Sequence, residues 1–354
     1  MKTGFVILFA SLAISSSCLF IPNLAEEQGA SLATISVIVS AYNIALFIAY
    51  YIFGRASDVY GRRMFLKIGL FSSIVTFALQ ALAYDNTTLL VSRILCGFTV
   101  GIFPAALTAY VFERKEDMGK FTSYGSLGWS LGTLLAGLVA YYTGIFLMAS
   151  LSFIIAFLIA LRLPHVTEKR IHVPLLPMKV LRKNFNVYTA FILRHTGANM
   201  AWTILPLYMT NLGASSHAIG VLYFLNTGTQ AVVMRYIGHH KSQSLINSGL
   251  LLSTIVFMMY PFASSYLQVA PIQILLGVAW SALYLGCLKS MGDENVEKAT
   301  ATGLLYSAQS LSAIIGPLLC ALLPETHNYA YVMAGAALIS LSGFAVDNIR
   351  NILK

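Results

Sequence analysis

Residues 54–63 read Gly-Arg-Ala-Ser-Asp-Val-Tyr-Gly-Arg-Arg, the densest run of charge among the first hundred residues. The run lies between two long apolar segments, at 33–53 and 64–83. A short hydrophilic connection between two such segments predicts a tight loop that joins two membrane-spanning helices. The interpretation of the remaining sequence starts from this loop.

The composition excludes an ordinary soluble domain. The 354 residues are 58% hydrophobic and only 10% charged, whereas soluble domains carry about 25% charged residues. So few charges cannot cover a water-exposed surface, and we expect a polytopic protein embedded in a lipid bilayer. The net charge of +9 is then typical of loops held in the cytoplasm, and we expect no nucleic-acid partner.

Twelve apolar segments approach the roughly 20 residues that a helix needs to cross a bilayer. We place them at 4–21, 33–53, 64–83, 89–112, 121–142, 145–163, 187–209, 218–234, 243–263, 267–288, 299–322 and 330–346. The longest connection, 164–186, is rich in proline and basic residues. We therefore predict an all-α membrane protein with a six-helix bundle at 1–163, a cytoplasmic central loop at 164–186 and a second six-helix bundle at 187–354.

Charge asymmetry orients these spans. With both termini in the cytoplasm, every Lys and Arg except Arg93 and Arg194 falls in a cytoplasmic loop, tail or helix end, as the positive-inside rule requires. The external connections carry only acids, which are Glu26, Glu27, Asp85 and Glu325. This orientation needs 4–21 to be a retained span; a cleaved signal peptide ending near Cys18 is the alternative.

Internal repeats predict two homologous halves. Residues 93–97 (RILCG) align with 273–277 (QILLG), and residues 132–135 (GTLL) align with 316–319 (GPLL), at nearly the same offset. Such paired matches are typical of transporters built from structural repeats. The pattern Gly-x-x-x-Asp-x-x-Gly-Arg-Arg at 54–63 resembles the loop after the second helix in the major facilitator superfamily of secondary transporters.

The resemblance implies a gating role for this loop, which in the family locks the cytoplasmic side while the outside is open. Gly54 and Gly61 permit close backbone approach and unusual dihedral angles. Asp58 can cap free N–H groups at the start of a neighbouring helix, which we expect to be the eleventh. Arg62 and Arg63 can pair with acids at nearby helix ends. The alternative is a positive-inside loop without a gating role.

The fourth span carries an arginine and two glycines four residues apart, Arg93, Gly97 and Gly101. Glycines at this spacing form a flat face for helix packing. The pattern resembles the family's fourth-helix motif, whose arginine is associated with proton transfer or substrate-linked movement. The alternative is that Arg93 extends its side chain to the lipid headgroups.

The fifth span resembles the signature of the family's antiporters, but Thr133 and Ala136 replace its proline and one glycine. Ordinary packing of small residues is the alternative interpretation. The residues expected to pack helices closely here and in the eleventh span are Gly128, Gly132, Gly137, Gly316 and Pro317.

Polar and aromatic residues of four spans are expected to face a central cavity, because spans one, four, seven and ten surround it in the fold that the resemblance implies. Those that we expect at the substrate are Arg93, Arg194, His195, Asn199, Trp202, Gln273, Trp280 and Tyr284. Positions 195, 199 and 202 share one helix face. The alternative is that His195 is a buried residue without a direct role.

Arg194 lies near the predicted bilayer midplane, where an arginine costs about 2.5–3.5 kcal/mol to insert. No predicted span has an Asp or Glu in its middle to offset this charge. We therefore expect Arg194 to border a wet cavity and to favour substrates with an acidic or strongly electronegative group. If a coupling ion is used, its site would need Asp58, His195 or loop acids.

The resemblance implies a secondary active transporter that moves a small solute, anionic or drug-like, by alternating access; an efflux antiporter is one form of this function. A non-transporting receptor or scaffold on the same fold is the alternative. The sequence has no nucleotide-binding loop and no His-Glu-x-x-His motif, so we expect no enzyme, no cofactor and no metal. We expect a monomer in a prokaryotic inner membrane.

Overall fold

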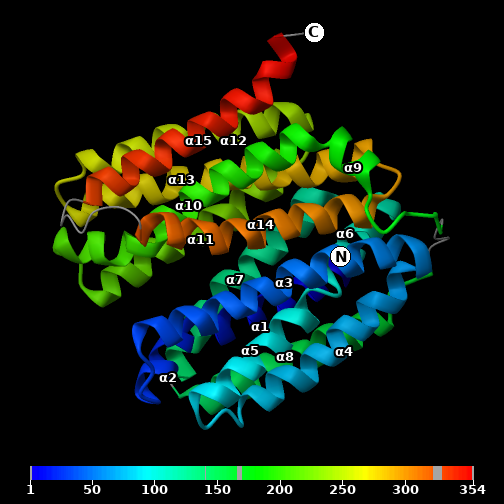
Figure 1. Ribbon diagram of the computed structural model, residues 1–354, viewed down its shortest axis with the longest axis horizontal. Helices are drawn as coiled ribbons and strands as arrows, with labels where there is room; N and C mark the ends of the chain where they lie inside the picture. The colour runs from blue at the N-terminus through cyan, green and yellow to red at the C-terminus, as the bar shows by residue number, and fades with distance from the viewer. Residues whose placement is uncertain (1, 140, 166–169, 322–328, 353–354) are drawn as a thin grey trace. The chain divides into compact units, whose positions relative to one another are not determined.

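The computed structural model describes residues 2–139, 141–165, 170–321 and 329–352, and within these ranges it contains helices and no strand. The chain divides into two compact units. Unit 1 comprises residues 1–180 and 292–307, and unit 2 comprises residues 181–291 and 308–354. The all-α fold predicted from the sequence is confirmed (Figure 1).

Most helices belong to one unit alone. Those of unit 1 are α1 (Lys2–Leu19), α2 (Ile21–Glu27), α3 (Leu32–Tyr60), α4 (Arg62–Gln80), α5 (Asn86–Val100), α6 (Pro104–Glu113), α7 (Met118–Val139) and α8 (Tyr142–Leu161). Those of unit 2 are α10 (Phe185–Asn211), α11 (Ser216–Ile237), α12 (Ser242–Met259), the short 3₁₀ helix η1 (Tyr260–Phe262) and α15 (Tyr329–Ile352).

Three helices pass from one unit into the other: α9 (Met178–Lys183), α13 (Tyr266–Glu294) and α14 (Lys298–Ala321). The end of α13 and the start of α14 belong to unit 1, whereas the remainder of each helix belongs to unit 2. Helix α14 is therefore one continuous helix that both units share. The division at 1–163, 164–186 and 187–354 stays a prediction.

Nine helical stretches among the described residues are long and apolar enough to cross a membrane. They coincide with predicted spans one to four, six and nine to twelve. Spans five, seven and eight are present as the long but less apolar helices α7, α10 and α11. The count of twelve spans therefore stays a prediction, and the external acid Glu325 lies outside the described residues.

Helix ends follow local sequence signals. The Ser31 hydroxyl accepts from the Thr34 N–H and caps α3. Asp85 forms a capping box with Thr88 at the start of α5, and the hydrogen bonds that its carboxylate accepts from Thr88 lower the pKa of Asp85. Pro104 begins α6, because a proline at the first helical position sacrifices no helical hydrogen bond. The fourth predicted span is accordingly built from two helices.

Glycines allow close contacts in the core of unit 1, where α1 packs along α7 and α8 and α3 packs along α5. A side chain on Gly128 would clash with the Leu8 carbonyl, and one on Gly132 would clash with the Leu12 carbonyl and the Ser15 hydroxyl. The two packing glycines of α5 are close to α3 in the same way: Gly97 adjoins the Tyr42 carbonyl and Gly101 adjoins Ala49.

Gly137 does not share this role. No described atom lies within 4 Å of the Cβ that an alanine would place there, so the sequence-based expectation of close packing is wrong at this position. The residue lies near the end of α7, where the neighbouring helices no longer approach the backbone.

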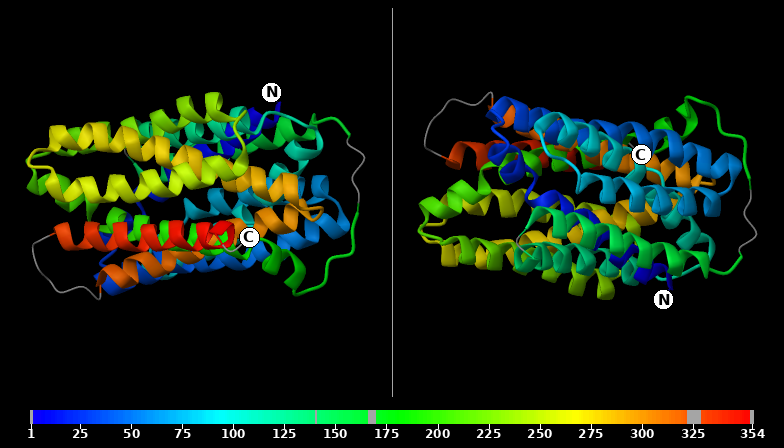
Figure 2. Two further views of the ribbon diagram at one scale, coloured as in Figure 1. Left: turned by 90° about the horizontal axis from the view of Figure 1, so that it is seen from above. Right: turned by 90° about the horizontal axis from the view of Figure 1, so that it is seen from below.

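Unit 2 is organised around α15, which runs along α10 and α12 and is drawn in red in Figure 2. Its apolar core includes the buried side chains of Met209, Phe257, Leu276 and Met333. Gly316 of α14 packs against Asn199 and the Thr196 carbonyl of α10. Pro317 follows it inside α14.

We expect Gly128→Ala to lower the thermal stability of the purified protein, because the added methyl group would force α1 and α7 apart. Overpacking of this kind costs about 1–3 kcal/mol. Gly137→Ala in the same helix is the matched control: it should be neutral or stabilising, since alanine is better than glycine in a helix by about 1 kcal/mol. Equal melting temperatures for the two variants would contradict the close contact between α1 and α7.

Candidate functional site

The motif at 54–63 is mostly helical, so the prediction of a ten-residue loop is wrong. Helix α3 continues through Tyr60, and α4 starts two residues later at Arg62. The break is Gly61 alone, with a φ of 113°, a value that residues with a side chain rarely adopt. One glycine therefore turns the chain between the two helices.

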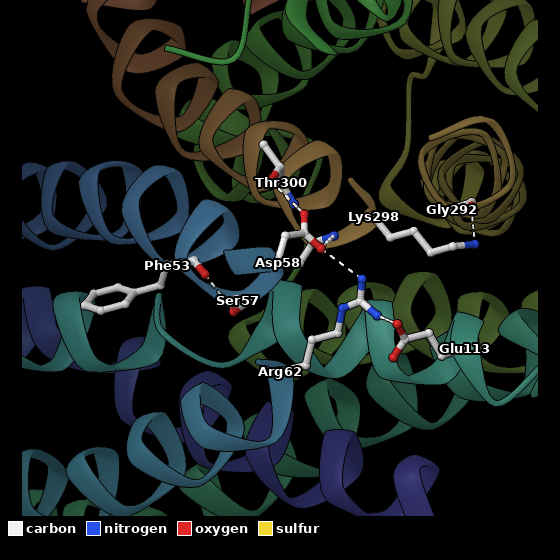
Figure 3. Close-up of polar contacts among 9 residues, drawn as sticks. Phe53, Ser57, Asp58, Arg62, Glu113, Gly292, Lys298 and Thr300 are labelled. Atoms are coloured by element: carbon white, nitrogen blue, oxygen red, sulfur yellow. Dashed lines mark hydrogen bonds and ion pairs between the residues drawn. The ribbon is translucent and has the colours of Figure 1, made fainter. Parts of the chain in front are cut away.

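Asp58, in the last turn of α3, caps the start of α14 as the sequence predicted for the eleventh span (Figure 3). One carboxylate oxygen accepts from the Thr300 N–H and the Thr300 hydroxyl, both at 2.7 Å, and the other accepts from the Ala299 N–H at 3.2 Å. The first N–H groups of a helix have no partner within the helix, and a negative charge there also meets the positive end of the helix dipole. Asp58 is only 1% exposed, so water screens this attraction poorly.

Arg62 balances the charge of Asp58. Its Nη2 donates to the Asp58 carboxylate at 2.9 Å, and its Nη1 forms an ion pair with Glu113 at the end of α6 (Figure 3). The Arg62 side chain is 3% exposed. Removing one member of such a buried charge network typically costs about 3–5 kcal/mol, because its partner is left buried without compensation.

Gly54 brings the two helices together. A Cβ at Gly54 would lie 2.9 Å from both the Ala299 carbonyl oxygen and the Cα of Gly303. Further along the same contact, the Ser307 hydroxyl donates to the Phe47 carbonyl. The small residues of α3 and α14 therefore set the distance at which Asp58 reaches the start of α14.

Basic residues of the motif also hold the segment that follows α8. Arg55 Nε donates to the carbonyls of Val173 and Pro174, and Arg63 Nη2 donates to the carbonyl of Leu163. The Ile171 N–H donates to the backbone carbonyl of Asp58. Sequence reasoning, which assigned acids as partners for Arg63, missed this use of backbone carbonyls, because nothing in the sequence shows that Leu163 and residues 171–174 lie beside the motif.

Arg93 is buried within unit 1 with 3% exposure, which argues against an extended conformation towards the headgroups. Its guanidinium carbon lies 3.9 Å from the centre of the Tyr42 ring, and Nη2 lies 3.3 Å from the Cys18 sulfur. Its Nε and Nη1 have no hydrogen-bond partner among the described residues. Among the described residues, the arginine is therefore held by one aromatic face and one thiol, and by no acid within hydrogen-bonding distance.

Arg194 is the largest fully buried side chain in the described part of the protein. Its Nε donates to the Ser253 hydroxyl of α12 at 2.9 Å, and its guanidinium carbon lies 5.1 Å from the Trp280 ring centre. Nη1 and Nη2 have no hydrogen-bond partner among the described residues. Contact with a substrate stays a prediction for this residue.

His195 belongs to a row of rings that we call the aromatic stack: Phe191, His195, Trp280 and Tyr284. The ring centres of His195 and Trp280 are 5.0 Å apart, and those of Trp280 and Tyr284 are 5.1 Å apart. Trp202 meets His195 edge to face, as their spacing on one face of α10 predicted. Trp202, Trp280 and Tyr284 are half-buried, so part of this ring surface is open.

The two amides among the expected cavity residues differ: the Asn199 side chain is hydrogen-bonded within its own helix, whereas the side-chain nitrogen of Gln273 has no hydrogen-bond partner among the described residues. The Asn199 side chain donates to the His195 carbonyl, one turn back in its own helix. The backbone carbonyl of Gln273 accepts from the side chain of Asn226, and Gln273 itself is 1% exposed. The structure thus brings Arg194, His195, Trp202, Trp280 and Tyr284 together, with Asn199 one turn from His195 and Gln273 at a contact between α13 and Asn226 of α11.

Asp347 is a buried acid that the sequence did not single out. The last predicted span ended at residue 346, but α15 continues to Ile352, and Asp347 is 5% exposed. The pattern of apolar residues alone could not reveal that Asp347 is buried, because Asp347 lies among polar residues near the end of the chain. Within the described residues no group of three His, Cys, Asp and Glu side chains could hold a metal ion.

Comparisons with known proteins agree with this architecture. A family model described as Major Facilitator Superfamily matches residues 3–317. The multi-drug resistance efflux pump PmrA of Streptococcus pneumoniae is 26% identical over 78% of this chain and 75% of its own length. The quinolone resistance protein NorA of Staphylococcus aureus is 21% identical over 92% of this chain and 89% of its own.

Among solved structures, the human organic anion transporter MFSD10 (TETRAN) superposes with a TM-score of 0.84, covering 98% of this chain and 97% of its own, at 19% sequence identity. The fold and the helix-capping motif define a membrane transporter of the alternating-access class. The chain belongs to the Major Facilitator Superfamily and is a secondary transporter of a small solute.

We expect Asp58→Asn and Thr300→Val to be energetically coupled, since the first removes the charge from the hydrogen bond between the Thr300 hydroxyl and Asp58 and the second removes its donor. A double-mutant cycle on the thermal unfolding of the purified protein should give a coupling energy of about 0.5–3 kcal/mol. Thr254→Val is the control, because the Thr254 hydroxyl bonds only within α12; with Asp58→Asn it should be additive. Additivity of both pairs would contradict the cap.

Proposed function

We propose that this protein exports a small organic solute, and that Asp58 stabilises the state in which its cytoplasmic side is closed. The observation that carries the gating proposal is the buried carboxylate bound to the start of α14, a helix whose remainder belongs to unit 2. Export is supported by the names of two relatives, an efflux pump and a resistance protein. In this proposal, release of the cap frees α14 and permits opening to the cytoplasm.

The substrate is proposed to be drug-like and to carry an acidic or strongly electronegative group. Arg194 has two guanidinium nitrogens without a hydrogen-bond partner among the described residues, and the half-buried rings beside it can stack on a planar solute. The name of the human organic anion transporter is in keeping with such a substrate. We propose a monomer without enzymatic activity, in a prokaryotic cell membrane.

We expect the purified protein in proteoliposomes to transport a carboxylated fluorescent dye faster than a cationic dye of similar size. Arg194→Gln should nearly abolish this flux, and Arg194→Lys should reduce it, because lysine keeps the charge but loses the forked donor geometry. Lys179→Gln, at an exposed position of α9, is the control for a change of net charge and should transport normally.

A receptor or scaffold would show no flux in this experiment with any dye. Wild-type apparent affinity in a well-expressed Arg194→Gln variant would instead refute the role of Arg194 while leaving the transport proposal intact.

We also propose that both termini are cytoplasmic. Single cysteines at the exposed positions Glu26 and Tyr60, in a background without native cysteines, should then differ in labelling by an impermeant reagent. Glu26→Cys should react in intact cells, and Tyr60→Cys only after permeabilisation. Tyr60 suits this test because it is 58% exposed, whereas Ser57, one turn before it, is buried. Reaction of Tyr60→Cys in intact cells would refute the orientation.

A further inference from the structure

Cys18 is a cysteine whose sulfur contacts a buried cation. It lies in the last turn of α1, it is half-buried, and its sulfur accepts a hydrogen bond at 3.3 Å from Nη2 of Arg93 on α5. Cys96 and Cys287 are buried, and Cys320 is half-buried without a hydrogen bond to any described residue. Reactive cysteines lie beside positive charge and are partly exposed, and Cys18 combines both features.

Arg93 has hydrogen-bond donors that its present contacts do not use. It is 3% exposed, and its Nε and Nη1 have no hydrogen-bond partner among the described residues. Its guanidinium carbon lies 3.9 Å from the centre of the Tyr42 ring on α3. A buried charge is costly unless it is paired, so an anion that reached these donors would be stabilised. The planar fork of a guanidinium matches anions with two oxygens especially well.

Helix packing fixes the positions of the sulfur and the guanidinium. Gly97, one turn beyond the arginine on α5, adjoins the Tyr42 carbonyl and keeps α5 close to α3. On α1, the residue before the cysteine is Ser17, whose hydroxyl donates to Oε1 of Gln80 on α4 at 3.2 Å. The contact between thiol and arginine is therefore supported by an anchor on each side.

Oxidation would turn the Cys18 thiol into an anion of the kind that Arg93 can bind. A hydrogen peroxide molecule transfers one oxygen to the sulfur: an S–O bond forms, the O–O bond breaks, and water leaves with the thiol proton. A second peroxide converts the sulfenic acid to a sulfinic acid and also leaves as water. Each step removes two electrons from the sulfur and reduces one peroxide. The sulfinic acid then gives its proton to water, and its two oxygens share the negative charge.

We propose that Cys18 is a peroxide modification site at which Arg93 stabilises the sulfinate. The sulfinate oxygens take up N–H donors of the guanidinium, and the resulting ion pair ties α1 to α5 within unit 1. The proposal goes beyond the proposed function, because the modification requires neither a transported solute nor a coupling ion. Its oxidant is a peroxide.

The test is peptide mass spectrometry of the purified protein after treatment with hydrogen peroxide. We expect Cys18 to gain two oxygen atoms several-fold faster than Cys320, the half-buried control in unit 2. Arg93→Gln should slow the oxidation of Cys18 and leave that of Cys320 unchanged. Arg93→Lys should have an intermediate effect, because lysine keeps the charge but loses the fork. Equal rates for the two cysteines of the wild type would overturn the proposal even if the variants do not fold.

A second measurement uses aspartate as an analogue of the oxidised side chain, since both carry two oxygens on the atom bonded to Cβ. Cys18→Asp should melt at a higher temperature than Cys18→Asn, which has the same shape without the charge. In an Arg93→Gln background this order should reverse, because the carboxylate would then lose its cation. A Cys18→Asp protein no more stable than Cys18→Asn would overturn the ion pair.

Discussion

The Asp58 carboxylate at the start of α14 is the interaction on which the other features of the motif depend. It satisfies N–H groups that the helix itself leaves without partners, and its burial strengthens the attraction. Arg62 balances its charge and is itself paired with Glu113. Gly61 turns the chain shortly after Asp58, and Gly54 lets α14 come close enough to be capped. The remainder of α14 belongs to unit 2, which is why we propose a gating role for this contact.

The two units bury charge in different ways. In unit 1 the buried charges of the motif are ion-paired, with Arg62 in contact with the carboxylates of both Asp58 and Glu113. In unit 2 Arg194 is buried, and its Nη1 and Nη2 have no hydrogen-bond partner among the described residues. An ion-paired network stabilises one conformation, whereas a buried guanidinium with unused donors is available to bind an anion. We infer that unit 1 supplies the latch and unit 2 supplies the anion-binding residue.

The membrane class and the helix positions could be predicted from the lengths of the apolar segments. The cap by Asp58 could be predicted from the spacing of the motif residues. Both signals lie in consecutive residues of the sequence. The end of helix α3 could not be predicted from apolar length. The apolar segment ends at Phe53, but favourable capping and packing continue the helix to Tyr60. Two further features depend on contacts that no local pattern encodes. These are the backbone partners of Arg55 and the burial of Asp347.

The central claim is that the Asp58 cap stabilises closure of the cytoplasmic side. It is tested most directly by the distance between spin labels on the cytoplasmic ends of the two units, measured for the wild type and for Asp58→Asn. A helix-end charge contributes about 0.3–1 kcal/mol, and more when it is partly buried, which shifts a balanced equilibrium several-fold. The account predicts a larger long-distance population in Asp58→Asn; an unchanged distance distribution in a folded variant with unchanged transport would contradict it.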